Sequence, residues 1–516
     1  MLSLGTLINR NARRYGRQDA YVELNRRISW KQLDQRTDAL AHILKSWNVA
    51  RGDRIGVILK DSIEVVETIG ACAKIGAIRV GLNYRLAPPE IGALIDDSGV
   101  SVLFVQADLL AIAEAALLHS ARKPILVGIG ASHDLKHDYE TLITSGIECG
   151  AFEQTPGDRL MICYTTGSTG LPKGAIYPHR MMLESMAAIA LAEGATPDDV
   201  WLHAMPASGV PIMHLLRNLF QGTKCAIIGE WDAKTALTLI ERERATICVL
   251  VPTMLNSLLT SGLITKYDCS SIRQLGYGSA PIPPATIRDA LKAFGCRFLQ
   301  MYGTTELMGM SMMLTATDHE RALKEGHHCL ESIGRPLYFA ETKIVDDDGS
   351  ALPAGEVGEL LINTPYVIPG YWNQDIQYAE TVRDGWLHTG DIAMMDEEGF
   401  VFLKDRAKFR IKSGGYNIFP VEIENCLAEH ECVNEVCVFG LPDPKWGDRI
   451  QAVVSLSSGG SVTGEELRAY CRGKIANFKI PKKIEIWENL PKGPTGKIQK
   501  LEIIASYTHS LSSKSA

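Results

Sequence analysis

Short apolar runs alternate with helical patterns through the first 150 residues, and this alternation limits the fold more than any other feature. The runs 54–60, 77–83 and 101–105 are typical of buried strands, and 62–74 is typical of a helix. Ser29 precedes Gln32 by three residues, a capping-box spacing that predicts a helix from Trp30. Strands separated by helices usually pair in parallel. We therefore predict an α/β fold, with a large N-terminal domain of parallel sheets covered by helices.

Two later regions depart from this pattern. The segments 358–363 and 399–405 predict antiparallel, hairpin-linked strands, which would add a β-rich lobe. The chain after about residue 409 predicts a short mixed module with helices from Val421 and Thr463 and strands at 434–441, 450–457 and 483–488. We expect a large domain over 1–404, a hinge at 405–408, and a small mobile α+β domain over 409–516.

Composition excludes several classes of protein. The chain has 516 residues, 46% of them apolar, which suffices for a large core. Its net charge of −7 lacks the basic excess of a nucleic-acid-binding protein. No window reaches the roughly 18 apolar residues of a membrane span, and the N-terminus lacks the apolar block of a signal peptide. The 12 cysteines form no CxxC pair, so we expect buried thiols and a cytoplasmic location.

The most specific segment is 163–175, CYTTGSTGLPKGA, which lies between an apolar strand and a helix expected after Pro178. Its glycines let backbone amides approach a ligand closely. Its hydroxyls (Thr166, Ser168 and Thr169) and Lys173 can donate to phosphate oxygens. The spacing differs from the Walker pattern, because position 172 is proline. The segment therefore predicts a phosphate-binding loop of another kind.

This loop resembles the signature of the adenylate-forming superfamily, which contains acyl-CoA synthetases, peptide-synthetase adenylation domains and firefly luciferase. Further motifs of the superfamily follow in its order: GYGSAP at 276–281, YGTTE at 302–306, WLHTGD at 386–391, DRAKFRIKSGG at 405–415 and PKGPTGK at 491–497. Six motifs in order span nearly the whole chain. The sequence is most similar to a stand-alone acyl-CoA synthetase.

The resemblance implies a nucleotide site. Tyr302 would offer its ring to adenine, Asp391 and Arg406 would hold the ribose, and Glu306 would be the oxygen ligand of Mg²⁺. The full set of implied ATP and AMP contacts is Thr165, Thr166, Gly167, Ser168, Thr169, Gly170, Lys173, Gly278, Ser279, Ala280, Tyr302, Gly303, Thr304, Thr305, Asp391, Arg406 and Lys497.

Cations alternate strictly at positions 404, 406, 408, 410 and 412. On spacing alone, a continuous edge strand would carry all of them on one face. The resemblance implies instead an interrupted strand, with Lys408 as the hinge and Gly414 and Gly415 lining a tunnel for CoA. It also implies that Lys497 bridges the substrate carboxylate and the α-phosphate. The implied catalytic residues are Lys497, Glu306, Thr166 and Lys173.

The sequence thus predicts an ATP-dependent carboxylic acid–CoA ligase that uses ATP, Mg²⁺ and CoA. It would adenylate a hydrophobic fatty or aryl acid, releasing pyrophosphate, and pass the acyl group to CoA, releasing AMP. Methionines at 308–313 favour the hydrophobic acid. The alternatives are a stand-alone enzyme that activates an amino or other acid for a carrier protein, a non-catalytic nucleotide-binding relative, and a luciferase-like oxygenase. We expect small-molecule partners, no nucleic acid and no membrane span, and the oligomeric state stays open, with a homodimer as one option.

One segment, 203–213, departs from the superfamily. Gly209 stands where relatives often carry a histidine of the acyl pocket. His203 and His214 lie nearby in the sequence, and neither can be assigned that role. This departure affects the expected gating of the acyl pocket and leaves the adenylation chemistry unaffected.

Overall fold

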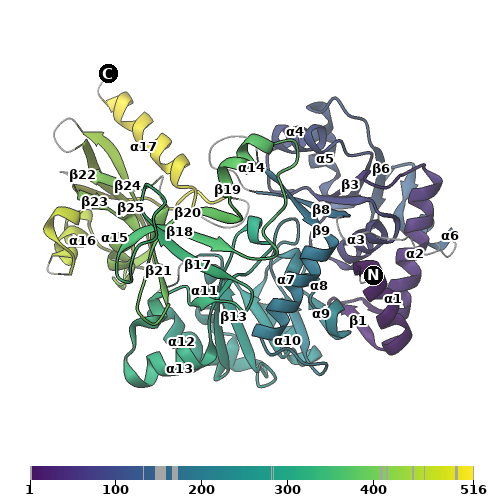
Figure 1. Ribbon diagram of the computed structural model, residues 1–516, viewed down its shortest axis with the longest axis horizontal. Coiled ribbons are helices and arrows are strands. Elements are labelled where there is room, and N and C mark those ends of the chain that lie inside the picture. The colour runs from purple at the N-terminus through teal and green to yellow at the C-terminus, as the bar shows by residue number, and fades with distance from the viewer. Residues whose placement is uncertain are drawn as a thin grey trace.

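The computed structural model describes residues 3–131, 133–145, 158–165, 172–280, 282, 284–406, 409, 411–413, 416–443, 447–457, 459–472, 474–493 and 498–514. The N-terminal helices lie at one end of the molecule and the C-terminal elements at the other (Figure 1). Two large sheets, with helices between and outside them, form most of the chain. A smaller antiparallel sheet and a C-terminal sheet complete it.

The first large sheet has the order β7-β6-β5-β3-β4-β8-β9. Its strands are β3 (Arg54–Ile58), β4 (Ile78–Gly81), β5 (Val102–Gln106), β6 (Ile125–Ile129), β7 (His137–Asp138), β8 (Arg159–Tyr164) and β9 (Gly174–Pro178). All neighbours pair in parallel except β8 and β9, which are antiparallel. The predicted strands at 54–60, 77–83 and 101–105 are therefore confirmed.

The second large sheet has the order β16-β15-β14-β13-β12-β10-β11-β1-β2. Its strands are β1 (Asp19–Val22), β2 (Arg27–Ser29), β10 (Val200–His203), β11 (Lys224–Ile227), β12 (Ile247–Leu250), β13 (Gln274–Gly278), β14 (Arg297–Tyr302), β15 (Met312–Leu314) and β16 (Arg335–Pro336). The run from β14 to β1 is parallel, and antiparallel strands close both edges.

Helices form three layers around these sheets. The middle layer packs against both sheets in one apolar core and contains α1 (Leu4–Tyr15), α2 (Trp30–Ser46), α3 (Ile63–Ile75), α6 (Tyr139–Ser145), α7 (His179–Ala192), α8 (Ile212–Leu216) and α9 (Asn218–Gln221). The outer face of the first sheet is covered by α4 (Pro88–Ser98) and α5 (Leu110–Leu118). That of the second is covered by α10 (Ala233–Glu243), α11 (Pro252–Thr260), α12 (Pro284–Phe294) and α13 (Ala316–Glu325).

The predicted β-rich lobe is present and antiparallel. It contains β17 (Glu341–Val345), β18 (Val357–Asn363), β19 (Val382–Arg383), β20 (Trp386–Met395) and β21 (Val401–Arg406), with α14 (Asp375–Thr381) beside it. β20 and β21 pair as neighbours in the sequence, whereas β18 pairs with β17 and β20. The α/β class with this added lobe is confirmed.

The C-terminal elements form a sheet and an apolar core of their own. They are β22 (Ile411–Ser413), β23 (Tyr416–Ile418), α15 (Pro420–Ala428), β24 (Val433–Asp443), β25 (Gly447–Leu456), α16 (Gly464–Cys471), β26 (Lys483–Ile486) and α17 (Lys500–Lys514). Figure 1 shows them in yellow-green and yellow, on the far side of the lobe from α1. The mixed module predicted after residue 409 is thereby confirmed in its elements.

The run of alternating cations does not form one strand. β21 ends at Arg406 and belongs to the lobe, whereas β22 begins at Ile411 and pairs with β25 in the C-terminal sheet. The interpretation as a continuous edge strand is therefore wrong, and the interruption expected from the resemblance is correct.

The sequence also predicted no membrane span and buried, unpaired cysteines. Within the described ranges, no helix combines the length and apolar character that a bilayer crossing requires. The cysteines described there carry free thiols, most of them buried, as at Cys72, Cys163 and Cys248.

We predict that Ser29→Ala loosens the first turn of α2. The Ser29 side chain accepts a hydrogen bond from the Gln32 amide, and the Gln32 side chain accepts one from the Ser29 amide. Losing such a cap costs about 1 kcal/mol, so amide hydrogen exchange over 30–33 should be about fivefold faster. Ser46→Ala, which removes an exposed hydroxyl at the other end of α2, is the control. Equal exchange in the two variants would contradict the cap.

Candidate active site

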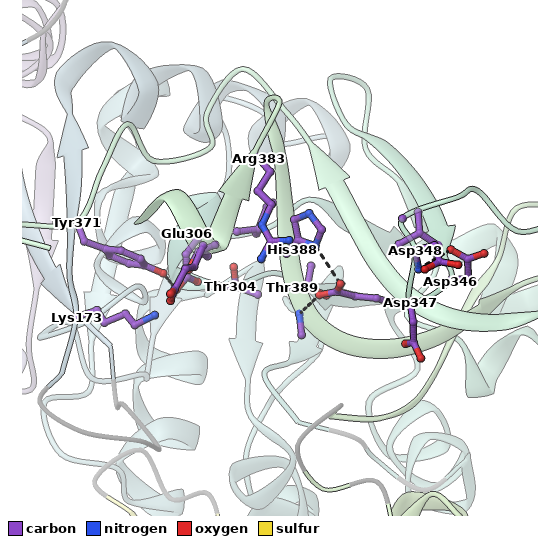
Figure 2. Close-up of a pocket in the computed structure, with 17 residues that line it drawn as sticks. Lys173, Thr304, Glu306, Asp346, Asp347, Asp348, Tyr371, Arg383, His388 and Thr389 are labelled. Carbon is purple, nitrogen blue, oxygen red and sulfur yellow. Dashed lines mark hydrogen bonds and ion pairs between the residues drawn. The ribbon is translucent and has the colours of Figure 1, made fainter. Parts of the chain in front are cut away.

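A cavity of about 570 Å³ opens where the first large sheet, the second large sheet and the lobe meet. Figure 2 shows its lining side chains converging from these three parts of the fold. The lining consists of Lys173, Thr304, Glu306, Val345, Asp346, Asp347, Asp348, Gly349, Glu359, Tyr371, Glu380, Thr381, Arg383, Leu387, His388, Thr389 and Gly390. The structure thus brings Lys173, Thr304 and Glu306 together, although they are distant in the sequence.

The phosphate-loop segment connects the antiparallel strands β8 and β9. Its base is closed by two bonds, because the Thr165 amide donates to the Lys173 carbonyl at 2.9 Å and the Lys173 amide donates to Thr165 Oγ1 at 3.2 Å. This closure holds Lys173 at the cavity wall. The predicted contacts Thr166, Gly167, Ser168, Thr169 and Gly170 lie outside the described residues.

The YGTTE motif begins at Tyr302, the last residue of β14. A Cβ atom at position 303 would overlap the carbonyl oxygen of Gly309, so the tight turn requires glycine. Thr304 lines the cavity, and its hydroxyl is buried without a hydrogen-bond partner in the described part of the chain. An unpaired buried hydroxyl is costly, and a phosphate oxygen would satisfy it. Thr305 uses its carbonyl to accept a bond from the Tyr177 hydroxyl at 2.7 Å and is not among the described lining residues.

Glu306 is held by Tyr371. The Tyr371 hydroxyl donates to Glu306 Oε1 at 2.6 Å, and Glu306 lines the cavity. Among the described residues, no group of three or more His, Cys, Asp or Glu side chains is placed to hold a metal ion. One carboxylate nevertheless fits Mg²⁺, because this ion usually keeps several waters and binds substrate phosphates together with one or two carboxylates.

The WLHTGD motif forms part of β20 and is bent at Gly390, where φ is +69°. Glu359 fixes the bend by accepting from the Gly390 amide at 3.1 Å and pairing with His388 Nδ1 at 3.0 Å. The following carboxylate, that of Asp391, accepts a bond from the Tyr302 hydroxyl at 2.5 Å. Asp391 is only 5% exposed. The two residues predicted for ribose and adenine are therefore in direct contact, just beside the cavity lining.

Arg406 lies opposite Asp391 in the β20–β21 pairing, although its side chain is outside the description. The GYGSAP motif ends β13 beside the end of β14. There a Cβ atom on Gly278 would overlap the Met301 carbonyl, and Ser279 adopts φ +69°. Gly278, Ser279 and Ala280 are not among the described lining residues of the cavity. Their contact with ATP remains a prediction.

Several lining residues were not predicted from the sequence, chiefly Tyr371, Glu359, Arg383 and the acidic run at 346–348. His388 stood inside a recognised motif without an assigned role. The others come from segments that carry no local signal of a site. Tyr371 reaches it because residues 370–372 bond to β9, nearly 200 residues earlier in the chain.

Of the two histidines near Gly209, His203 is buried and His214 is partly buried. His203 Nε2 lies 3.1 Å from Asp61 Oδ2, and Asp61 Oδ1 accepts the Ala207 amide at 2.7 Å. Burial lowers the pKa of His214. Neither histidine belongs to the described cavity lining. Of the two rings, that of His203 has a hydrogen-bonding neighbour in Asp61, whereas the buried Nδ1 of His214 has no partner among the described residues.

The methionines at 308–313, which the sequence allowed either in the core or in an acyl pocket, are core residues of the described structure. Met308, Met310, Met312 and Met313 are at most 3% exposed and belong to three different apolar clusters. They do not line the described cavity. The remaining predicted residues (Lys408, Gly414, Gly415 and Lys497) lie outside the described residues.

Comparison with known proteins places these motifs in a family. The model of the AMP-binding enzyme family matches residues 8–372, and that of the AMP-binding enzyme C-terminal domain matches residues 422–497. A fatty acid–[acyl-carrier-protein] ligase, ScoC, of Streptomyces coeruleorubidus is 32% identical over 486 residues, covering 93% of this chain and 91% of that protein. A feruloyl-CoA synthase of Amycolatopsis sp is 33% identical over 481 residues, covering 92% and 93%.

A solved structure agrees with these relatives. The O-succinylbenzoate coenzyme A synthetase of Bacillus subtilis, in complex with ATP and magnesium ion, superposes with a TM-score of 0.85 at 27% identity, covering 96% of this chain and 98% of that one. The chain therefore belongs to the AMP-binding enzyme family of the adenylate-forming superfamily.

Proposed function

We propose that the protein is an ATP-dependent carboxylic acid–CoA ligase. One observation carries this proposal: a single cavity is lined by Lys173, Thr304 and Glu306, and the Thr304 hydroxyl is buried without a hydrogen-bond partner among the described residues. A cation, a free donor and a hard oxygen ligand are what a metal-bound triphosphate requires. Family membership and relatives that are named as ligases support the same activity.

The reaction would proceed in two steps. A carboxylate oxygen of the acid attacks the α-phosphorus of ATP, the bond to the β-phosphate oxygen breaks, and pyrophosphate leaves. The thiol sulfur of CoA then attacks the acyl carbon, AMP leaves, and the thiol proton goes to solvent. Because two anions meet in the first step, positive charge must be concentrated around the phosphates.

The chain's own residues would divide this work. Lys173 and the Thr304 hydroxyl would bind phosphate oxygens, and Asp391 with Arg406 would accept and orient the ribose. Glu306 would hold Mg²⁺, which would neutralise phosphate charge when bound. Lys497 would lie between the substrate carboxylate and the α-phosphate during adenylation. Thr166 and the other loop residues at 165–170, with Gly278, Ser279 and Ala280, would complete the nucleotide contacts.

We also propose a domain boundary at 405–408, between a large domain over 1–404 and a small mobile domain over 409–516. The end of β21 at Arg406 and the start of β22 in another sheet at Ile411 support it. Lys408 would be the hinge, and Gly414 and Gly415 would line the CoA tunnel after rotation. The two family models leave residues 373–421 between them, a span that includes this boundary.

The substrate class rests on the relatives. ScoC is named for a fatty acid and the Amycolatopsis enzyme for ferulate, so a hydrophobic fatty or aryl acid is the proposed substrate. ScoC also transfers to an acyl-carrier protein, according to its name, which keeps a carrier protein as the alternative acceptor. The largely buried free thiols suit the proposed cytoplasmic location.

A panel of fatty, aryl and amino acids tests the function. With ATP, Mg²⁺ and CoA, we expect at least one fatty or aryl acid to give AMP and an acyl-CoA in equal amounts, measured by chromatography. Pyrophosphate exchange without acyl-CoA, followed by acyl transfer to a phosphopantetheinylated carrier protein, would establish the alternative acceptor. Absence of exchange with every acid would overturn the proposed enzyme.

Thr304→Ala should weaken ATP binding. A hydrogen bond to a charged group contributes about 1.5–3 kcal/mol, so the KM for ATP in pyrophosphate exchange should rise about 10- to 100-fold. Ser311→Ala is a matched control, because Ser311 also carries a buried, unpartnered hydroxyl within the described residues but does not line the cavity. An equal change in both variants would show that Thr304 acts only through packing.

Lys497→Ala should separate the two steps. Acyl-adenylate formation should fall by several orders of magnitude, whereas conversion of supplied acyl-AMP and CoA to acyl-CoA should persist, because only the first step joins two anions. Lys492→Ala is the control, since Lys492 pairs with Glu435 at 2.7 Å. Equal loss of both half-reactions in Lys497→Ala would contradict the assigned role.

A further inference from the structure

Tyr371 lies between the two charged groups that the proposed function assigns to the phosphates and the metal. Its hydroxyl donates to Glu306 Oε1 at 2.6 Å, and Lys173 Nζ lies 5.0 Å from the centre of its ring. Figure 2 shows the hydroxyl directed at Glu306 and the lysine beside the ring. Tyr371 is only 2% exposed, so its position is set by packing. One side chain therefore contacts both charges from the protein side of the cavity.

The backbone around Tyr371 is tied to the same two elements. Residues 370–372 pair with β9, where the Ile176 amide donates to the Gly370 carbonyl at 3.1 Å and the Trp372 amide donates to the Gly174 carbonyl at 2.7 Å. In the same segment, the Ile368 amide donates to the Glu306 carbonyl at 2.8 Å. The segment consequently connects the strand after the phosphate loop with the residue that would ligate the metal.

A second tyrosine stiffens this arrangement. The Tyr378 ring packs edge-on against Tyr371 at 6.2 Å, and its hydroxyl donates to the Ile368 carbonyl at 3.0 Å. Tyr371 thus has neighbours on several sides. Its phenol cannot turn away from Glu306 without disturbing this packing.

The chemistry of the two contacts is complementary. A phenol that donates to one carboxylate oxygen fixes the carboxylate and leaves the other oxygen for a hard cation. A tyrosine hydroxyl carries its proton at neutral pH, so Tyr371 is the donor in this contact. The ring face attracts the Lys173 ammonium without consuming its N–H donors, which stay available to phosphate.

We infer that Tyr371 is a positioning residue that sets the place of the metal-ligating carboxylate through its hydroxyl and the place of the phosphate-binding lysine through its ring. This inference rests on the proposed function and adds a residue to it. The hydroxyl and the ring of Tyr371 have different roles. Tyr371→Phe removes only the hydroxyl, whereas Tyr371→Leu removes both, so the two substitutions distinguish the roles.

The test measures metal binding directly. Mn²⁺ in place of Mg²⁺ is titrated into the full-length protein with a non-hydrolysable ATP analogue, and free Mn²⁺ is followed by its electron paramagnetic resonance signal. For Tyr371→Phe we expect about 10- to 100-fold weaker Mn²⁺ binding, because a hydrogen bond to a charged group is lost, with analogue affinity at saturating Mn²⁺ changed less than threefold. For Tyr371→Leu we expect both affinities to fall, because the ring is also lost.

Tyr378→Phe is the matched control. It removes a phenol hydroxyl from the same aromatic pair without touching Glu306, so Mn²⁺ affinity should stay within twofold of the parent. Combining Tyr371→Phe with Glu306→Gln should add little to the effect of Glu306→Gln alone, since the tyrosine acts through that carboxylate.

Unchanged Mn²⁺ affinity in Tyr371→Phe, or equal losses in Tyr371→Phe and Tyr378→Phe, would overturn the inference. Thermal unfolding of each variant identifies any general loss of structure, and if Tyr371→Leu is unfolded, the comparison of the two Phe variants still decides. Failure of the proposed function would look different, because the parent protein would then show no pyrophosphate exchange with any acid.

Discussion

The antiparallel pairing of β8 with β9 is the constraint on which the site depends. Within a sheet whose other pairings are parallel, this pair reverses the chain direction between Tyr164 and Gly174, and β9 forms the edge of the sheet. Hydrogen bonds between Thr165 and Lys173 join the two ends of the connecting segment, so Lys173 has a defined position. β9 then offers its other edge to residues 370–372, which carry Tyr371. Because β9 runs antiparallel to β8 at the edge of the sheet, residues 370–372 of the lobe can bond to it.

Close backbone packing and buried hydrogen bonds fix the other residues around the cavity. Gly303 and Gly278 allow two strand ends to approach backbone that would exclude any larger residue. Asp391 is almost fully buried, and its carboxylate accepts a hydrogen bond from the Tyr302 hydroxyl. In the bend that precedes it, the Gly390 amide donates to the Glu359 carboxylate. Glu306, His388 and Gly390 at the cavity thus each have a neighbour that fixes them, whereas the Thr304 hydroxyl is buried without a partner among the described residues.

Local patterns predicted the local structure well. The capping box at Ser29, the buried strands of the first sheet and the helix after Pro178 all follow from residue spacing, and the structure confirms them. The motifs also predicted that Lys173, Thr304 and Glu306 would meet. Tyr371 and Glu359 could not be predicted, because their roles arise from strand pairings that join segments far apart in the sequence. Methionines at 308–313 suggested an acyl pocket but fill the core, since an apolar side chain gives the same sequence signal in either place.

The hydrogen bond between Tyr302 and Asp391 holds the Asp391 carboxylate in place before any nucleotide binds. A carboxylate buried this deeply is costly unless it is hydrogen-bonded, and the Tyr302 hydroxyl supplies such a bond to one of its oxygens. If Asp391 binds the ribose as proposed, an arriving sugar hydroxyl would join a carboxylate that is already fixed in place. Nucleoside binding would then require little rearrangement at this point, which would favour rapid exchange of AMP for ATP.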